Sequence, residues 1–298
     1  MFKETGQDIK QFVENNRHLV TMRETSYPGV YVLKYKKTVF FKNLWNEFLE
    51  ECRGTLVDID FNIVSRPFTK IYNYGIESRS PILPETTKIT AIRKVNGFMV
   101  AVTLYNNDIL VSTTGSTDSD HVKMALELID HNKYKKVCQD WPNYTFMFEC
   151  VHPNDPHIIP EESGMYLLGW RSNAWNSAIE YSQMTAGLLA QYLDCRFVNC
   201  AETTVGELLK EVKQVRHEGF VFYSADGISA KIKSPYYLVK KFVARNPNTT
   251  KLLDAHVKEK IDEEYYPLID FIQANIEEFT ALNEQNRLLY VRAFLGAQ

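Results

Sequence analysis

The 298-residue chain contains 45% hydrophobic and 24% charged residues, an ordinary globular composition with room for one large domain and a smaller one. Its net charge of -3 gives no global sign of nucleic-acid binding, and its five scattered cysteines, without a Cys-x-x-Cys pair, argue against a disulfide framework or a structural zinc site. We expect a soluble cytoplasmic protein, because no export signal opens the sequence and no apolar run approaches the ~20 residues of a membrane helix.

Alternating and β-branched runs predict the strands of an α+β fold. Short connections rich in Asn, Asp and Gly join two pairs of these runs, over residues 97–115 and 219–234, and predict two antiparallel hairpins. In chain order, the predicted strands are residues 29–35, 54–60, 62–68, 88–94, 97–105, 108–115, 144–151, 164–172, 219–226 and 227–234.

Helical periodicity appears between the strands and again near the end of the sequence. The predicted helices between strands are residues 119–132, 181–194 and 204–213. The last of them would begin with a capping box formed by Thr204 and Glu207. After about Pro247 the pattern is helical. We therefore expect a large domain over residues 1–246 and a small helical domain over residues 247–298.

The segment ITAIRKVNGFMVAV, residues 89–102, places a lysine, an amide and a glycine between two strand-like runs. Asn-Gly is a strong hairpin signal, so Lys94 followed by Asn96 and Gly97 has a plain interpretation as a turn between two paired strands. The other interpretation is a reactive lysine presented by this turn. Polar residues elsewhere in the chain have to decide between the two.

Four polar clusters lie in or beside predicted strands, where folding alone favours apolar residues, and such departures often mark function. Lys231 and Lys233 are two residues apart, so in a strand both ammonium groups point to one face and repel each other unless an anion lies between them. Glu149 falls at a position expected to be buried, where a carboxylate needs a partner. The clusters contain Arg53, Lys94, Glu149, and Glu218 with Lys231 and Lys233.

Charge is unevenly distributed over the last third of the sequence. Residues 231–251 contain six cations and no acid, whereas residues 261–278 are strongly acidic. A basic stretch with aromatic residues between its cations can bind a phosphate backbone, although a solvated charged face is the more common explanation.

Together the clusters predict a cleft with a basic floor and two carboxylates, suited to a nucleoside triphosphate and its divalent metal. The sequence has neither a GxxxxGK[ST] nor a GxGxxG motif, so phosphate binding would rely on Lys and Arg side chains. The segment HPNDPH, residues 152–157, could hold a metal, but its two prolines favour a structural turn.

Five motifs occur in the order and spacing of the covalent nucleotidyltransferases: ECRG, Lys-x-Asn-Gly, a strand glutamate, a Glu-Gly strand and a final Lys-x-Lys. Within that superfamily, the chain most resembles the ATP-dependent RNA ligases of the bacteriophage RNA ligase 1 type. LEECRGTLVDID, SRPFTKIYN, EGFVFY and AKIKSPYY carry this closer resemblance. It implies an ATP-grasp-like nucleotidyltransferase domain of antiparallel sheets flanked by helices, with a small C-terminal helical domain.

The resemblance implies that Lys94 attacks the α-phosphate of ATP, forms lysyl-AMP and releases pyrophosphate. The adenylate would pass to an RNA 5′-phosphate, and a 3′-hydroxyl would then displace AMP and seal the two RNA ends, as in RNA or tRNA repair. Glu218 would lie near a metal, Mg2+ or Mn2+, or near the reacting lysine. The resemblance also implies contacts of Arg53 with ribose or phosphate, of Glu149 with the sugar, of Lys231 and Lys233 with the α-phosphate, and of Tyr35, Lys70, Asn96 and Gly97 with the nucleotide.

The attack requires a neutral amine, and a lysine with the ordinary pKa of ~10.4 is neutral less than ~0.1% of the time at pH 7. Neighbouring cations lower such a pKa, and we expect Arg53, Arg93, Lys231 and Lys233, or a bound metal, to do so.

The sequence departs from the family in three places. Asn96 stands where aspartate is usual, and Thr114 stands where lysine is frequent. The 65 residues after Lys233 read as helical and lack the strands of the OB barrel that follows in DNA ligases and capping enzymes, which favours an RNA ligase.

Three hypotheses remain: an active ATP-dependent RNA ligase, another nucleotidyltransferase of the capping or DNA-ligase type, and a non-catalytic RNA-end-binding protein. We expect RNA ends as partners, with no membrane and no obligate protein partner. If the chain is phage-encoded, as the resemblance suggests, the location would be the host cytoplasm.

Overall fold

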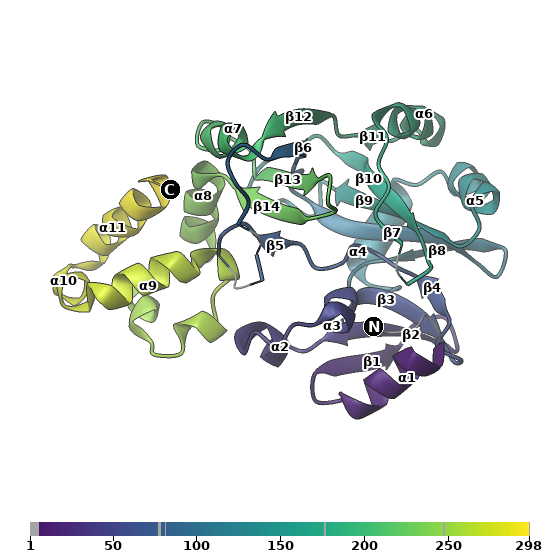
Figure 1. The fold of residues 1–298 in the computed structure, drawn as a ribbon, viewed down its shortest axis with the longest axis horizontal. Coiled ribbons are helices and arrows are strands. Elements are labelled where there is room, and N and C mark those ends of the chain that lie inside the picture. The colour runs from purple at the N-terminus through teal and green to yellow at the C-terminus, as the bar shows by residue number, and fades with distance from the viewer. Residues whose placement is uncertain (1–5, 77–78, 81, 176, 247, 298) are drawn as a thin grey trace. The chain divides into compact units, whose positions relative to one another are not determined.

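The computed structural model describes residues 6–76, 79–80, 82–175, 177–246 and 248–297, and these form two compact units (Figure 1). Unit 1 comprises Met1–Lys70, Gly97–Pro156 and Glu161–Asn199, and unit 2 comprises Ile71–Asn96, His157–Pro160 and Cys200–Gln298. Both units contain sheets of mostly antiparallel strands with helices beside them, so the predicted α+β class is confirmed.

Unit 1 contains two sheets. The first has the order β1-β2-β3-β4 and is fully antiparallel, with β1 at Val20–Glu24, β2 at Val30–Tyr35, β3 at Arg53–Asp58 and β4 at Ile63–Ser65. The second has the order β11-β10-β9-β7-β8, with β7 at Phe98–Tyr105, β8 at Asp108–Ser112, β9 at Tyr144–Val151, β10 at Gly164–Ser172 and β11 at Arg196–Phe197. Only β10 and β11 pair in parallel in these two sheets.

Helices pack on the second sheet of unit 1 and enclose its main core. Val100, Phe146, Phe148 and Leu167 of the strands lie in this core, each at most 1% exposed. The helices of unit 1 are α1 at Gly6–Asn15, α2 at Lys37–Phe41, α3 at Glu47–Glu51, α4 at Asp120–Glu127, α5 at His131–Asp140 and α6 at Gln183–Leu193. Of these, α4, α5 and α6 contact the second sheet.

The single helix predicted over residues 119–132 is wrong, because the chain forms two helices there, α4 and α5. The Asp130 carboxylate accepts hydrogen bonds from the backbone N–H groups of Asn132 and Lys133, both at 3.1 Å. An aspartate in this N-cap role begins a new helix, which apolar periodicity alone does not reveal.

Unit 2 contains one sheet in the order β12-β6-β13-β14-β5. Its strands are β5 at Tyr72–Asn73, β6 at Lys88–Arg93, β12 at Cys200–Thr204, β13 at Gly219–Ser224 and β14 at Ser229–Lys233. Helix α7, Val205–Glu211, packs on this sheet over Ile89 and Phe222, and its capping box of Thr204 and Glu207 is confirmed. The two predicted hairpins, β7-β8 and β13-β14, are also confirmed.

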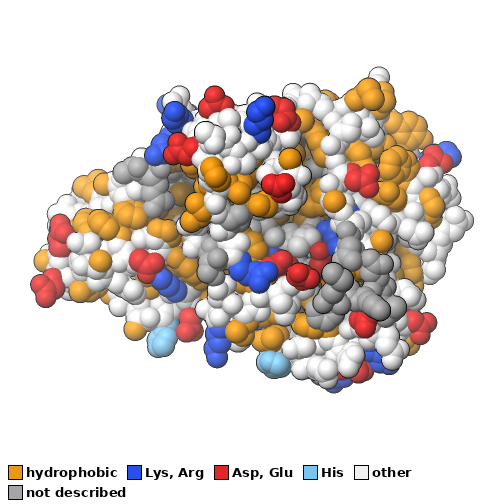
Figure 2. All heavy atoms as spheres, in the orientation of Figure 1, with side chains coloured by type: hydrophobic (Ala, Val, Ile, Leu, Met, Phe, Trp, Pro, Cys, Tyr) orange, Lys and Arg blue, Asp and Glu red, His pale blue; other side chains and the backbone are white. Residues whose placement is uncertain are grey.

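The predicted helical character of the C-terminal segment is confirmed. Its elements are α8 at Pro235–Arg245, the 3-10 turns η1 at Thr249–Leu253, η2 at Val257–Glu259 and η3 at Glu263–Tyr265, and the helices α9 at Tyr266–Ala274, α10 at Ile276–Ala281 and α11 at Glu284–Ala297. They share a core that includes Phe242, Leu268 and Phe279. Figure 2 shows apolar side chains, in orange, on the surface of this segment. Phe271 of α9 and Leu289 of α11 are among the exposed apolar residues.

The predicted domain boundary between residues 246 and 247 falls inside unit 2. Pro247 itself lies outside the described residues. The division into residues 1–246 and 247–298 therefore stays a prediction. Among the described residues, none of the helices is long and apolar enough to cross a membrane.

Candidate functional site

The segment around Lys94 does not form a hairpin. Strand β6, which ends at Arg93, pairs with β12 and β13, whereas β7, which begins at Phe98, pairs with β8 and β9. The interpretation of Asn96-Gly97 as a turn between paired strands is therefore wrong, because the flanking strands belong to different sheets. A short sequence signal gives the turn but not the pairing of the strands beside it.

Gly97 is required by a close approach of two main-chain segments in unit 1. A Cβ atom at Gly97 would lie 2.2 Å from the carbonyl oxygen of Cys150, which no side chain could accommodate. The N–H of Gly97 donates to Oε1 of Glu149 at 3.0 Å, and Glu149 is only 7% exposed. The burial and the partner expected for Glu149 are thus both present.

Lys94 and Glu218 contact each other in unit 2. The backbone N–H of Lys94 donates to the carbonyl of Gly219 at 2.8 Å, and Lys94 Nζ donates to Glu218 Oε2 at 3.1 Å. Gly219 has φ of 136°, and a Cβ there would lie 2.0 Å from the carbonyl oxygen of Ile232. Only glycine fits this position, so the Glu-Gly pair sets the carboxylate beside the lysine.

Asn96 is buried at 5% exposure, and both ends of its amide have partners within unit 2. Its Nδ2 donates to Glu218 Oε2 at 2.8 Å, and its Oδ1 accepts from the N–H of Ile159 at 2.9 Å. An amide can donate to an ionised carboxylate, which an ionised aspartate cannot do. The departure from the family's aspartate therefore suits the charge on Glu218.

Glu218 is held ionised by its surroundings. Burial by itself would raise the pKa of the Glu218 carboxyl, but the Lys94 and Lys233 ammonium groups and the hydrogen bonds from Lys94 and Asn96 hold this pKa below its ordinary value. An opposite charge at this distance also favours the charged form of a lysine. Cations were expected around Lys94, yet its ion pair is with a carboxylate.

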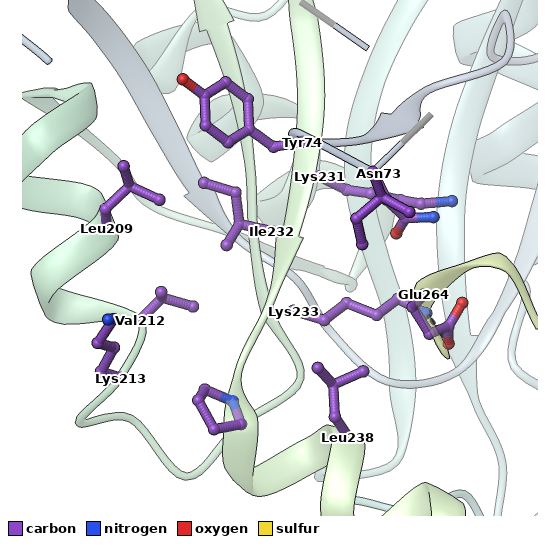
Figure 3. A pocket seen from close by; sticks show the side chains of 12 residues that line it. Asn73, Tyr74, Leu209, Val212, Lys213, Lys231, Ile232, Lys233, Leu238 and Glu264 are labelled. Carbon is purple, nitrogen blue, oxygen red and sulfur yellow. Dashed lines mark hydrogen bonds and ion pairs between the residues drawn. The ribbon is translucent and has the colours of Figure 1, made fainter. Parts of the chain in front are cut away.

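The alternation predicted for Lys231 and Lys233 is confirmed. Figure 3 shows both side chains extending from one side of β14, while Ile232 between them points to the other side. Ile232 packs in the core with Phe222 and Leu209. The anion expected between the two lysines is supplied by the acidic stretch that follows in the sequence, because Lys231 Nζ lies 3.2 Å from Glu263 and Lys233 Nζ lies 2.9 Å from Glu264.

Glu264 joins Lys233 to a third lysine. Lys241 Nζ lies 2.6 Å from Glu264, while Lys233 Nζ also lies 3.7 Å from Glu218. Burial would raise the pKa of Glu264, but Lys233 and Lys241 hold it well below its ordinary value. Burial would in turn lower the pKa of Lys233, but Glu264 and Glu218 raise it above its ordinary value.

A pocket of about 170 Å³ lies at this end of β14 (Figure 3). Its lining is apolar on the side of Leu209 and Val212 and charged where Lys231, Lys233 and Glu264 meet. The basic residues that sequence analysis assigned to a solvated face or to phosphate binding therefore include three lysines held in ion pairs with residues 262–264.

In unit 1, Arg53 begins β3 and stands opposite Lys34 of β2, at an irregularity of the strand register. Gly54 after it has φ of 100°, and a Cβ there would lie 2.8 Å from Cα of Thr114. The main chain of Thr114, the position where the family frequently has lysine, thus packs directly against the turn that carries Arg53.

Lys70 and Tyr35 both contact Trp45 in unit 1. Lys70 is 7% exposed, and its Nζ lies 4.8 Å from the ring centre of Trp45 and 5.2 Å from that of Phe40. Tyr35 meets Trp45 edge-to-face at 4.7 Å. Lys70 is therefore buried against two aromatic rings and is not a solvated surface lysine.

A buried ion cluster around Glu51 was not predicted from the sequence. Glu51 accepts from Arg66 Nε and Nη2 at 3.0 and 2.9 Å, and from Arg171 Nη2 at 3.0 and 3.2 Å. Thr69 donates its hydroxyl to the same carboxylate at 2.8 Å. The only sequence signal was a glutamate in LEECRG that helical periodicity would place toward the core.

The predicted site residues therefore fall into two sets. Lys94, Asn96, Glu218, Lys231 and Lys233 belong to unit 2, where contacts connect Lys94, Asn96, Lys233 and Glu218. Tyr35, Arg53, Lys70, Gly97 and Glu149 belong to unit 1, where Trp45 joins Tyr35 to Lys70, and Glu149 binds Gly97. Within the described ranges, no group of three or more His, Cys, Asp or Glu could hold a metal ion, at HPNDPH or elsewhere.

Comparison with solved structures identifies the same fold in ligases. Two forms of an archaeal ATP-dependent RNA ligase match with TM-scores of 0.61 and 0.59 at 15% and 16% identity, covering 96% and 97% of this chain and 75% of each of theirs. A protein from Aquifex aeolicus assigned as an ATP-dependent DNA ligase matches with a TM-score of 0.56 at 15% identity, over 97% of this chain and 77% of its own.

A family model described as RNA ligase matches residues 51–238, well over half of the chain. The matched range contains the ECRG, Lys-x-Asn-Gly and Lys-x-Lys motifs together with Glu149 and Glu218. The sequence-based prediction of an RNA ligase is thus confirmed: the chain belongs to the RNA ligase family.

Proposed function

We propose that this RNA ligase is ATP-dependent and that Lys94 is its nucleophile. The observation that carries the proposal is the contact of Lys94 Nζ with the buried Glu218 carboxylate at 3.1 Å, in a strand connection that departs from hairpin structure. Lys94 is partly exposed, with 24% of its side-chain surface accessible, so its amine is reachable by a substrate.

In the proposed first step, neutral Lys94 Nζ attacks the α-phosphorus of ATP. An N–P bond forms, the bond between the α-phosphorus and the bridging oxygen breaks, pyrophosphate leaves with the electron pair, and Nζ loses a proton. In the second step, a 5′-phosphate oxygen of RNA attacks the same phosphorus and the lysine leaves. In the third, a 3′-hydroxyl attacks the activated 5′-phosphate and AMP leaves. Charge moves onto phosphate oxygens in each step, so positioned cations provide most of the stabilisation.

We propose that Glu218 controls the protonation of Lys94. The ion pair keeps the ammonium charged and oriented until nucleotide is bound. A divalent cation such as Mg2+ would supply charge neutralisation of the triphosphate, taking its ligands chiefly from phosphate oxygens and water with one or two carboxylates. Glu218 fits this role, because a hard cation prefers carboxylate oxygen and this carboxylate is ionised. Loss of the contact with Glu218 would leave Lys94 easier to deprotonate.

The other predicted residues keep their proposed roles. Lys231 and Lys233 would bind the α-phosphate, Arg53 would bind ribose or phosphate, and Glu149 would contact the sugar. Tyr35 and Lys70 would contact the nucleotide beside Trp45, and Asn96 and Gly97 would shape the segment that presents Lys94. We propose RNA ends, including broken tRNA, as acceptors, and the cytoplasm, a phage-infected host's among them, as the location.

Intact mass spectrometry tests the proposal directly. Purified protein is incubated with ATP and Mg2+ without RNA, beside Lys94→Ala and the control Lys88→Ala, an exposed lysine at the start of β6. We expect wild type and Lys88→Ala to gain one AMP and Lys94→Ala to gain none. A wild type stripped of bound nucleotide that gains no mass with ATP or GTP would contradict the proposal and favour a non-catalytic RNA-end-binding protein.

The acceptor is tested in the next step. The isolated lysyl-AMP protein is mixed with 5′-phosphorylated RNA or DNA strands of one sequence, each with a 3′-hydroxyl partner. We expect AMP transfer and sealing with RNA, and a preference for DNA would favour the DNA-ligase alternative that the fold also allows.

A further inference from the structure

Two carboxylates that no step of the proposed reaction uses contact both lysines of β14. Glu263 Oε1 accepts from Lys231 Nζ at 3.2 Å, and Glu264 Oε1 accepts from Lys233 Nζ at 2.9 Å. Both acids are buried, at 6% and 4% exposure. Glu263 and Glu264, which are consecutive residues of the 3-10 turn η3, therefore each bind one of the two lysines on the same face of β14.

Each carboxylate is fixed by a second donor. Asn73 Nδ2 donates to Glu263 at 2.7 Å from β5, the strand next to β14. Lys241 Nζ donates to Glu264 at 2.6 Å from α8. Glu263 is thus also held by a residue of β5, and Glu264 by a residue of α8. The positions of the two acids do not depend on the lysines of β14 alone.

The turn itself is anchored in the core of the C-terminal segment. Tyr265, directly after Glu264, is 1% exposed and donates its hydroxyl to the carbonyl of Leu238 at 2.9 Å. Its ring meets Phe242 edge-to-face at 5.5 Å. Withdrawing the turn would expose this side chain and break its hydrogen bond. The positions of the two carboxylates are therefore also fixed by the core of the C-terminal segment.

A fixed carboxylate restricts the positions of the ammonium group that binds it. Lysine is a flexible four-carbon chain with three rotatable donors, so an unsupported ammonium group samples many positions. One contact to a buried carboxylate fixes the ammonium group and leaves further N–H donors for a phosphate oxygen. A misplacement of about 1 Å in a group that positions a substrate can reduce the rate about 100-fold.

We propose that Glu263 and Glu264 are positioning residues, which hold Lys231 and Lys233 in the orientation that binds the nucleotide α-phosphate. The C-terminal segment, which contributes both acids, thereby takes part in adenylylation of Lys94. This inference rests on the proposed function and extends it to a segment without a role in that chemistry so far.

The test measures lysyl-AMP formation by the full chain in a single turnover, as a function of ATP concentration. The variants are Glu263→Gln and Glu264→Gln, with Asp270→Asn as the matched control, because Asp270 forms an exposed ion pair with Lys258 in the same segment. We expect each glutamine variant to lower the rate at saturating ATP roughly 10- to 100-fold. Asp270→Asn should stay within twofold of wild type, and the thermal midpoints give the folded fraction of each variant.

A double-mutant cycle separates positioning from a purely structural role. Lys231→Ala is compared alone and combined with Glu263→Gln, and Lys233→Ala alone and with Glu264→Gln. A residue that acts through its lysine adds little once the lysine is gone, so we expect each double variant to match its lysine variant within about threefold. Losses that multiply, or glutamine variants at the wild-type rate or above it, would overturn the inference.

The two possible failures are distinguishable. If wild type forms no lysyl-AMP with any nucleotide, the proposed function fails and the inference fails with it. If wild type reacts through Lys94 and the cycle is additive, only the inference fails. Should Glu264→Gln not fold, the Glu263 cycle alone decides, since Gln at residue 263 can still accept from Asn73.

Discussion

Each unit buries a carboxylate between two cations, but the cations differ. In unit 1, Glu51 lies between Arg66 and Arg171, which are 3% and 1% exposed. In unit 2, Glu218 lies between Lys94 and Lys233, and Glu264 between Lys233 and Lys241. The Glu51 carboxylate accepts five hydrogen bonds, counting the one from Thr69. In the lysine cluster, each lysine makes one contact with a given carboxylate.

Arginine and lysine differ in the chemistry that they allow beside a buried carboxylate. A guanidinium group stays protonated and binds a carboxylate through a rigid fork, so the Glu51 cluster is a fixed structural element of unit 1. An ammonium group can lose a proton and retains donors for a third partner. Under the proposed function, lysine rather than arginine is needed at residue 94, because the attack requires a neutral amine.

Exchanging the cation type at Lys94 tests this comparison most severely. We expect Lys94→Arg to keep an ion pair with Glu218 and to change the free energy of unfolding by about 1 kcal/mol or less, because the charge is retained. It should form no adduct with AMP, since a guanidinium group does not supply a neutral amine at neutral pH. Mass spectrometry and urea unfolding measure the two effects, with Lys88→Arg as the control. An AMP adduct on Lys94→Arg would show that another residue is the nucleophile.

Removing the carboxylate of the arginine cluster should, by contrast, mainly lower the stability of the fold. Glu51→Ala leaves two buried guanidinium groups without their anion, and we expect the free energy of unfolding to fall by about 3–5 kcal/mol. Glu47→Ala, an exposed acid of the same helix, should change it by about 0.5 kcal/mol or less. Denaturant unfolding measures both. A cost of under 1 kcal/mol for Glu51→Ala would mean that the cluster is not the fixed structural element inferred here.

Asn96→Asp introduces a second carboxylate beside Glu218 and tests how the lysine cluster responds to an added negative charge. Two adjacent carboxyls resist ionising together, which raises the pKa of the pair in the folded state. For an acid whose folded pKa lies above its unfolded value of ~3.9, stability falls as pH rises from that value through the folded pKa.

We expect the unfolding free energy of Asn96→Asp to drop relative to wild type by about 1–3 kcal/mol between pH 4 and 8. Lysyl-AMP formation should survive with a shifted pH profile. Asn73→Asp, at a buried amide that donates to Glu263 in the same unit, should show a drop in the same direction, because it also pairs two carboxyls. A flat difference between wild type and Asn96→Asp over this pH range would contradict the reasoning.

How much the sequence could reveal depended on the range of the interactions. The alternation of Lys231 and Lys233 followed from the two-residue period of a strand, and the Thr204–Glu207 capping box from local spacing, so both were predictable. The local Asn96-Gly97 signal also allowed a hairpin that the structure does not form, because a turn signal does not reveal which strands pair. Local patterns carry no information about partners that tertiary folding brings together.

The candidate site shows the same limit. Family resemblance selected Lys94, Glu149 and Glu218 through their motifs, although Lys94 and Glu218 lie 124 residues apart in the sequence. The acidic stretch containing Glu263 and Glu264 was noticed only as a charge imbalance, because its pairing with β14 spans about 30 residues and depends on how α8 and η3 pack. The burial of Lys70 against Trp45 was likewise invisible, since an isolated lysine reads as a solvated one.

Acidification should have the smallest effect on stability, and it tests the lysine cluster through the titration of Glu218 and Glu264. The Glu218 and Glu264 pKa values lie below their ordinary range in the folded protein, despite burial, because of the neighbouring lysines. For such acids the stabilisation is fully present above the unfolded pKa of ~4.3 and is lost as pH falls through the folded value. We therefore expect the unfolding free energy of wild type to decline below about pH 4.3, by about 1.4 kcal/mol for each unit of pKa depression that is titrated.

Glu264→Gln removes one of these titrating groups and should decline less steeply between pH 5 and pH 3, even though it starts from a lower stability. Asp270→Asn removes an exposed acid, and its curve should run parallel to that of wild type. Denaturant unfolding at a series of pH values gives the slopes. Equal slopes for wild type and Glu264→Gln would mean that the carboxylate is not held ionised by Lys233 and Lys241, and the contrast between a reactive lysine cluster and a static arginine cluster would then depend on Lys94 and Glu218 alone.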